Sequence, residues 1–364
     1  MNFFKKLFGK KEKPLTVAGN EEFWQWFALH QETFYSSIKN KADVNKNFLN
    51  RIMPQLQGLN GQFYCVAGMY DANTAELIVT AEGDIKTFVF VEELMAAAPV
   101  INNWKFTALK SPVGTQSISI EMEEYEFNDK KISFFSNEHA DYPDEIDITL
   151  VHEDYTEENK GVISNGTFIY LDNILGELDA ATLIDNVTIG GRHPDNKELI
   201  PIEKLSEFLL WREKEFVEKY KGIRRDTEND AYSVLEGKDA QGKPLLAVIN
   251  KQLIEWDAKP SHPWMMLVTI QYTADNKSGM PGKDTYTLMD QFEEMVLQRL
   301  PDSEGYLSLG RETYNSTRTI YLACKEFRHA SKTASSCIDE YLEKLDISYS
   351  IFRDKYWMTM NKFS

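Results

Sequence analysis

The sequence contains little cysteine, little histidine and no long apolar run. Its 364 residues include three cysteines and six histidines. Cys65, Cys324 and Cys337 form no CxxC pair and have no histidine at zinc spacing, which excludes the common structural zinc motifs. An odd, sparse set of cysteines is typical of a reducing compartment. We therefore predict a cytoplasmic protein in which these three side chains act as small core hydrophobes.

No stretch offers the roughly 20 apolar residues that a membrane helix requires. The first residues, MNFFKKLFGKKEKP, also lack the apolar centre and cleavage site of a secretory signal. They do place apolar side chains on one helical face beside several lysines, the pattern of a short interfacial helix. These side chains are Phe3, Phe4, Leu7 and Phe8. Two helical turns are marginal on their own, so a solvated basic leader over residues 1–20 is favoured over weak membrane contact.

Acidic residues outnumber basic ones: the chain has 57 Asp and Glu and 40 Lys and Arg, which gives a net charge of −17. Such a charge repels a phosphate backbone, which disfavours nucleic-acid binding. The candidate strand GYLSLGRET also departs from the aromatic strand motif of RNA-recognition domains. The chain has no phosphate loop, nucleophile elbow, HExxH or dinucleotide fingerprint. We therefore predict no cofactor and no metal.

Hydrophobic residues make up 42% of the chain and aromatic residues 12%, which is enough for a folded protein. Its length favours two domains. Helical periodicity from Glu21, followed by alternating strands and helices, predicts an N-terminal α+β domain over residues 21–191. Residues 201–222 have the pattern of one long charged amphipathic helix. We place a linker helix and domain boundary at 192–230.

Residues 231–364 begin with the pattern of a hairpin. From Trp264 the order becomes strand, helix, strand, strand, helix, strand, which is the split βαβ or ferredoxin-like arrangement. The N-terminal half has a similar order without a residue-level repeat. The predicted fold is therefore α+β, with two ferredoxin-like domains of antiparallel sheets joined by a long helix.

The segment WDAKPSHPWMMLVTIQY raises the possibility of a catalytic corner. Its two prolines favour extended backbone and the start of a strand. Apolar residues on both faces of that strand predict a central position in the sheet. His262, with Asp257 nearby, is a candidate acid or base, but a plain loop residue before a strand is the more frequent case.

Several segments in the C-terminal half resemble the bacterial domain-of-unknown-function family DUF 695. They are INKQLIEWDAKPSHPWMML, SGMPGKDTY, YLSLGRET, RTIYLACKEFR and FRDKYW. The resemblance covers roughly Ala231 to Phe363, and the N-terminal half looks like the companion region found before that domain in similar bacterial proteins. The resemblance implies a fold and a bacterial lineage, and it supplies no catalytic residues.

Aromatic and arginine side chains of this half are the candidate binding residues, because they dominate protein contacts and recognise anions. They are Trp256, Trp264, Arg311, Arg328, Arg353, Tyr356 and Trp357. The arginines are equally suited to neutralising nearby acids. An acidic run over residues 138–158 offers oxygen ligands for a cation, but a solvated charged face is the better interpretation.

Two functions follow from these observations. The favoured one is a protein-binding or regulatory module acting on an unknown protein partner through sheet edges and aromatic loops. The alternative is a hydrolase-like enzyme that uses His262 in a cleft between the two domains. Convergence of His262, Arg311 and Tyr356 in one pocket would favour the enzyme.

Overall fold

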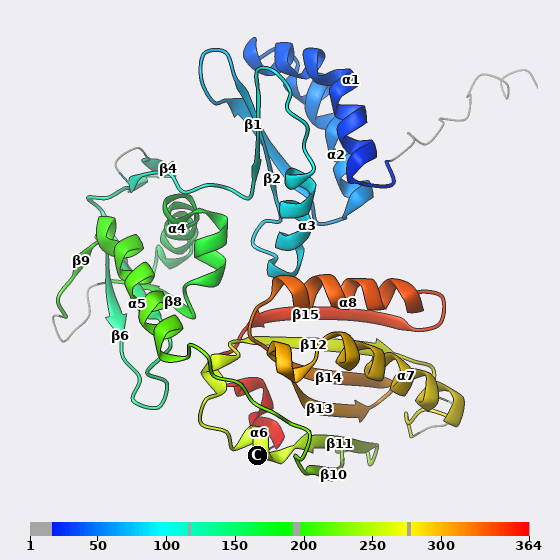
Figure 1. Cartoon of the computed structure of the whole chain (residues 1–364). Helices are drawn as coiled ribbons and strands as arrows, with labels where there is room; N and C mark the ends of the chain where they lie inside the picture. The colour runs from blue at the N-terminus through cyan, green and yellow to red at the C-terminus, as the bar shows by residue number, and fades with distance from the viewer. Residues whose placement is uncertain (1–16, 116–117, 192–196, 275–277, 364) are drawn as a thin grey trace, which may run out of the picture. The chain divides into compact units, whose positions relative to one another are not determined.

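A computed structural model describes residues 17–115, 118–191, 197–274 and 278–363. The chain, drawn in Figure 1, divides into two compact units. One comprises the described residues up to Glu82 together with Val91–Leu109, and the other comprises Gly83–Phe90 and the chain from Lys110 onward. The apolar face predicted for the leader lies outside the described residues. No helix within the described ranges combines the length and apolar character that crossing a membrane takes.

The first unit combines helices with a three-stranded sheet. Its elements are α1 (Asn20–Lys39), η1 (Asn45–Leu49), α2 (Asn50–Leu59), β1 (Tyr64–Met69), β2 (Ala75–Thr80) and β3 (Trp104–Ala108). The predicted apolar face of α1 is confirmed, because Phe23, Phe27 and Phe34 are fully buried. Phe27 packs edge-on against Trp104, with ring centroids 4.9 Å apart. Aromatic packing of this kind adds to the free energy of area burial.

A second, four-stranded sheet follows in the chain and belongs to the second unit. Its strands are β6 (Ile132–Asn137), β7 (Asp147–His152), β8 (Asn186–Gly190) and β9 (Ile200–Pro201), in the order β8-β7-β6-β9. A separate hairpin of β4 (Ile120–Met122) and β5 (Tyr125–Phe127) precedes it. The strands predicted for one domain over residues 21–191 therefore form separate sheets in two units.

Two strand pairs are parallel, so the prediction of purely antiparallel sheets is wrong for the N-terminal half. β2 pairs in parallel with β3, and β7 pairs in parallel with β8. In each case a helix lies between the two strands in the chain: α3 (Ile85–Ala96) or α4 (Lys160–Thr182). A crossover helix returns the chain to the starting edge, so the next strand runs in the same direction. Both segments are thus ββαβ units.

The predicted linker helix is α5 (Leu205–Lys219), preceded by the short helix η3 (Ile202–Lys204). Its first turns are part of a hydrophobic core, since Ile202, Leu205 and Leu209 are buried with residues of β6, β7 and α4. Phe216 and Tyr220, near its C-terminal end, are half-buried. The first part of α5 is therefore anchored on the four-stranded sheet through this buried face.

The C-terminal sheet has six strands and is antiparallel throughout. Its strands are β10 (Tyr232–Lys238), β11 (Pro244–Asn250), β12 (Trp264–Gln271), β13 (Tyr306–Tyr314), β14 (Thr317–Cys324) and β15 (Asp346–Arg353). Their order is β10-β11-β13-β14-β12-β15. The central position predicted for β12 is confirmed, because it pairs with β14 on one side and β15 on the other.

Both faces of this sheet are covered near its centre. On one face lie α7 (Lys283–Arg299) and α8 (Arg328–Tyr341) (Figure 1), which meet through Phe292 and Tyr341. The other face is closed by the short helices α6 (Lys251–Ile254) and η6 (Met358–Phe363), whose Leu253 and Met360 join a core with β11, β13 and β14. Because both faces of the sheet are covered, β12 carries apolar side chains on both of its faces.

Candidate functional site

A cleft of about 410 Å³ opens in the second unit between the end of α5 and the start of β12. Its walls are mostly apolar. They include Leu183, Phe216, Val217, Pro263, Trp264 and Phe327. Three residues predicted to bind a partner, Trp264, Arg328 and Arg353, also line this cleft. The structure therefore brings together, from β12, α8 and β15, residues that lie far apart in the sequence.

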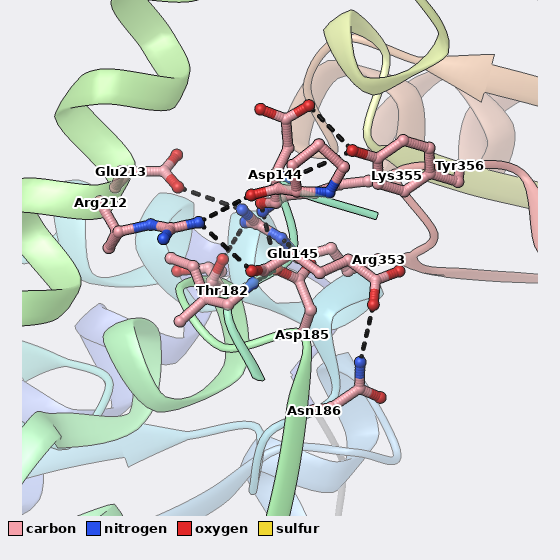
Figure 2. A network of polar contacts seen from close by, with 12 residues as sticks. Asp144, Glu145, Thr182, Asp185, Asn186, Arg212, Glu213, Arg353, Lys355 and Tyr356 are labelled. Atoms are coloured by element: carbon pink, nitrogen blue, oxygen red, sulfur yellow. Dashed lines mark hydrogen bonds and ion pairs between the residues drawn. The ribbon is translucent and has the colours of Figure 1, made fainter. Parts of the chain in front are cut away.

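Arg353 forms one wall of the cleft and is held by three acceptors (Figure 2). Its Nε lies 2.8 Å from Asp185 Oδ1, and its Nη2 lies 3.1 Å from Glu213 Oε2. Its Nη1 donates to the carbonyl oxygen of Thr182. Because Arg353 and Asp185 are each only 7% exposed, removal of either partner leaves a charge in a poorly solvated position.

Lys355 continues the same network and is completely buried. Its Nζ donates to Asp185 Oδ2 at 2.7 Å and to the main-chain carbonyl of Asp144. Burial and the nearby Arg353 charge lower the pKa of Lys355, while Asp185 opposes that shift. Asp185 thus accepts from two cations of the C-terminal segment at once.

Asp144 is the second acidic centre of the network (Figure 2). Its carboxylate accepts hydrogen bonds from Lys219 at 2.7 Å, Tyr220 at 2.7 Å and Tyr356 at 2.9 Å. Burial raises the pKa of Asp144, but these three donors lower it further than burial raises it. Tyr356, predicted as a contact for a partner, instead ties the C-terminal segment to the loop before β7.

The first turn of α8 reaches the cleft, but its amide groups are already bonded. Glu326 accepts from the main-chain N–H groups of Arg328 and His329, each at 2.8 Å. It also accepts from the Tyr306 hydroxyl at 2.8 Å. This carboxylate bonds two of the amide groups that a helix start leaves without an intrahelical partner, so these two are not available to an anion.

His262 lies beside the cleft but does not line it, although its neighbours Ser261 and Pro263 do. It is 1% exposed, and its Nδ1 lies 2.9 Å from Ser261 Oγ. Burial, aided by the positive charge of Lys325, lowers its pKa to about 4. The imidazole is therefore neutral at pH 7. Asp257 is exposed, so this candidate pair differs sharply in its access to solvent.

The tryptophans around His262 belong mainly to the interior. Trp357 is 1% exposed and donates from Nε1 to the His262 carbonyl at 3.0 Å. Trp256 is half-buried, with its ring centroid 6.0 Å from that of Trp357. Trp264 is 5% exposed. Binding by these aromatic residues remains a prediction, and the burial of Trp264 and Trp357 counts against a broad aromatic contact surface.

Arg311 lies on β13 in a different environment, beneath α7. Its Nη1 lies 3.0 Å from Glu293 Oε1, and Arg318, which is 0% exposed, lies 2.6 Å from Asp290 Oδ1. The contacts of these two arginines are thus those expected if they neutralise nearby acids, which was the alternative to binding a partner. His262, Arg311 and Tyr356 bond to different partners, which are Ser261, Glu293 and Asp144.

A second surface lies along β10, one of the two end strands of the C-terminal sheet. β10 ends the strand order and is mostly exposed along its length. Val234 is 62% exposed, Tyr232 46% and Leu235 36%. A groove of about 650 Å³ lies beside this strand, lined in part by Leu235, Ile249, Ile254 and Phe363.

Sequence reasoning missed Asp185, Glu213 and Thr182 as partners of Arg353. Asp185 follows the end of α4 in a turn, and nothing in the local pattern separates it from an ordinary surface acid. The available signal was the pair of candidate binding residues Arg353 and Tyr356, at and just after the end of the last strand. It identified the donors but carried no information about their acceptors.

The second unit therefore contains an α+β region with a six-stranded antiparallel sheet and helices on both faces. Residues 237–363 match a family described as a family of unknown function (DUF695). This match confirms the resemblance predicted from the sequence for the C-terminal part of the chain. No curated protein and no solved structure is similar enough to this chain to count as a match.

Proposed function

We propose that this protein is a binding module for another protein, and that it takes an extended segment of its partner as an added strand along β10. The observation that carries this proposal is the position of β10 at the end of the six-stranded order with most of its residues exposed. The partner segment that fits is extended, has apolar side chains at alternate positions and carries net positive charge.

The edge itself supports this mode of binding. In an antiparallel sheet, alternate residues of an edge strand direct their main-chain N–H and C=O groups away from the sheet. Natural proteins usually protect such edges, because they pair readily with other chains. β10 has one Lys and one Glu in its seven residues but exposes the apolar side chains of Tyr232, Val234 and Leu235. Main-chain pairing supplies affinity in this mode, and pockets for alternate side chains supply specificity.

The groove beside β10 supports the apolar part of the partner. Leu235, Ile249, Ile254 and Phe363 line about 650 Å³, which is room for apolar side chains of an added strand. The chain's net charge of −17 favours association with a basic segment through long-range attraction. The alternative of a hydrolase with His262 as acid or base has less support, because this imidazole is 1% exposed and lies outside the cleft lining.

Two finer inferences accompany this proposal. We infer a ferredoxin-like arrangement for β12 to β15 with α7 and α8, supported by the order β13-β14-β12-β15 and its antiparallel pairing. We also infer action in the cytoplasm of a bacterium. Support comes from the family resemblance and from the unpaired thiols of Cys65, Cys324 and Cys337.

A peptide-display selection against the full chain tests the proposal. We expect enriched peptides to alternate apolar and polar residues and to carry basic charge. Their binding should weaken at least about tenfold in Leu235→Glu, since a buried carboxylate in the groove is unfavourable. Leu342→Glu is the matched control, because Leu342 is an exposed leucine (69%) of the same unit.

Hydrogen exchange of the complex supplies the second readout. Bound peptide should slow amide exchange in residues 232–238, because added-strand pairing protects outward N–H groups. Enriched peptides that bind Leu235→Glu as well as wild type, or that protect other segments only, would refute strand addition at β10.

A further inference from the structure

The cleft between the end of α5 and the start of β12 has an unbalanced charge. Four cations and two acids contribute to its lining: Lys221, Lys325, Arg328, Arg353, Glu213 and Glu326. Glu213 pairs with Arg353, whereas Glu326 accepts only from neutral donors, the α8 amides and Tyr306, and keeps its negative charge. Arg353 is in turn neutralised by Asp185. The cleft therefore keeps an excess of positive charge in a protein whose overall charge is −17.

Lys221 and Lys325 contribute to that excess. Both are exposed residues that reach the cleft from opposite sides, one after α5 and the other after β14. Within the described part of the chain, neither has a carboxylate at ion-pair distance. A surface lysine in an acidic protein usually has many acids to pair with, so two such lysines on one cleft mark a place suited to an anion.

The remaining walls are largely apolar. Phe216, Trp264 and Phe327 are among the lining residues, and the Trp264 ring packs edge-on against that of Phe327, with ring centroids 4.9 Å apart. Arg353 adds a planar guanidinium held by Asp185 and Glu213 (Figure 2). A volume of about 410 Å³ falls in the range of small-molecule sites, which combine mostly apolar walls with a few polar groups.

The geometry points to a binding site for a small planar aromatic molecule that carries a negative charge. Its ring would lie among Phe216, Trp264 and Phe327, and its anionic group would lie toward Lys221 and Lys325. This site is independent of the β10 edge, since the two surfaces share no lining residue. A ligand bound here touches both the end of α5 and the start of β12, so it would stabilise the junction held by Arg353.

Calorimetric titration of the full chain with indole-3-acetate tests the inference, and indole-3-acetamide is the matched neutral probe. We expect the acid to bind with a Kd at or below about 1 mM. The amide should bind at least about tenfold more weakly, because it lacks the charge-assisted bonds of the carboxylate. Added salt should weaken binding of the acid and leave binding of the amide nearly unaffected.

Charge-reversal variants assign the binding to the cleft. Lys221→Glu and Lys325→Glu should each weaken binding of the acid at least about tenfold, because each places a like charge beside the carboxylate of the ligand. Both residues are exposed, so melting temperatures should stay near that of wild type. Lys214→Glu is the matched control: this exposed α5 lysine (74%) lies outside the cleft lining and should leave affinity within about twofold.

Three results would each overturn the inference. They are equal affinity for the acid and the amide, unchanged affinity in both lining variants, and absence of heat with either probe at several times the expected Kd. The peptide assay at β10 is a separate measurement. A negative calorimetric result would not contradict strand addition, and a negative peptide result would not contradict the cleft site.

Discussion

Arg353 Nε lies 2.8 Å from Asp185 Oδ1 across 168 residues of chain. This pair joins the end of β15 to the turn after α4, and Lys355 and Glu213 extend it on either side. Because the ions are largely removed from solvent, the junction depends on complete pairing. Single substitutions that change charge in this junction should therefore destabilise the fold.

We predict that Arg353→Met lowers the free energy of unfolding by about 3 kcal/mol, because it leaves Asp185 partly unpaired in a buried position. Denaturant titration measures the change. Lys204→Met is the control, since Lys204 pairs with Glu207 at an exposed position (59% and 74%), and its effect should stay below about 0.5 kcal/mol. Equal losses in the two variants would contradict a special role for the buried pair.

Asp144 should make the junction sensitive to acid. Its folded pKa is below the ordinary value, so its stabilisation is present above the unfolded pKa, close to 3.8, and is lost as pH falls through the lower folded pKa. Asp144→Asn should cost about 1 to 3 kcal/mol at pH 7. The difference from wild type should shrink below pH 4. Unfolding curves at several pH values measure it, with the exposed Asp141→Asn as control.

His262 should add a pH dependence at higher pH. Its folded pKa is about 4 against an ordinary 6.5, so the unfolded chain binds the extra proton and stability falls as pH drops from 6.5 toward 4. The full effect is roughly 3 kcal/mol. His262→Gln should flatten the dependence of the free energy of unfolding on pH between 4 and 6.5, whether or not the substitution itself changes stability. The exposed His329→Gln should keep the wild-type slope, and a variant profile as steep as wild type would disprove the assignment.

Gly310 should be irreplaceable at the bulge where β13 pairs with β14. Its φ is +132°, and a Cβ there would lie 2.1 Å from the Val248 carbonyl oxygen. Gly310→Ala should therefore cost more than about 2 kcal/mol, since strain and a backbone clash act together. Gly190→Ala, with no heavy atom within 4 Å of the added carbon, is the control for thermal unfolding.

Local pattern predicted much of the secondary structure, because periodicity reports which side chains face the interior. It located α1, the hairpin of β10 and β11, and the central strand β12. It did not reveal the parallel pairs, since the direction of a strand depends on how the preceding helix packs. It also left Trp264 and Trp357 open to either a core or a surface role, because tryptophan is common in both.

The amino-acid order alone established an acidic, cysteine-poor α+β chain with a DUF695-like C-terminal part. It also identified Arg353, Tyr356 and Trp357 as candidate binding residues at and after the end of the last strand. Three-dimensional packing decided which acids lie next to the cationic side chains and which arginines form internal ion pairs. It also decided which lysines lie beside a cleft. The reason is physical: hydrophobic periodicity is written in neighbouring residues, whereas an ion pair such as Arg353 with Asp185 depends on distant segments meeting where water is scarce.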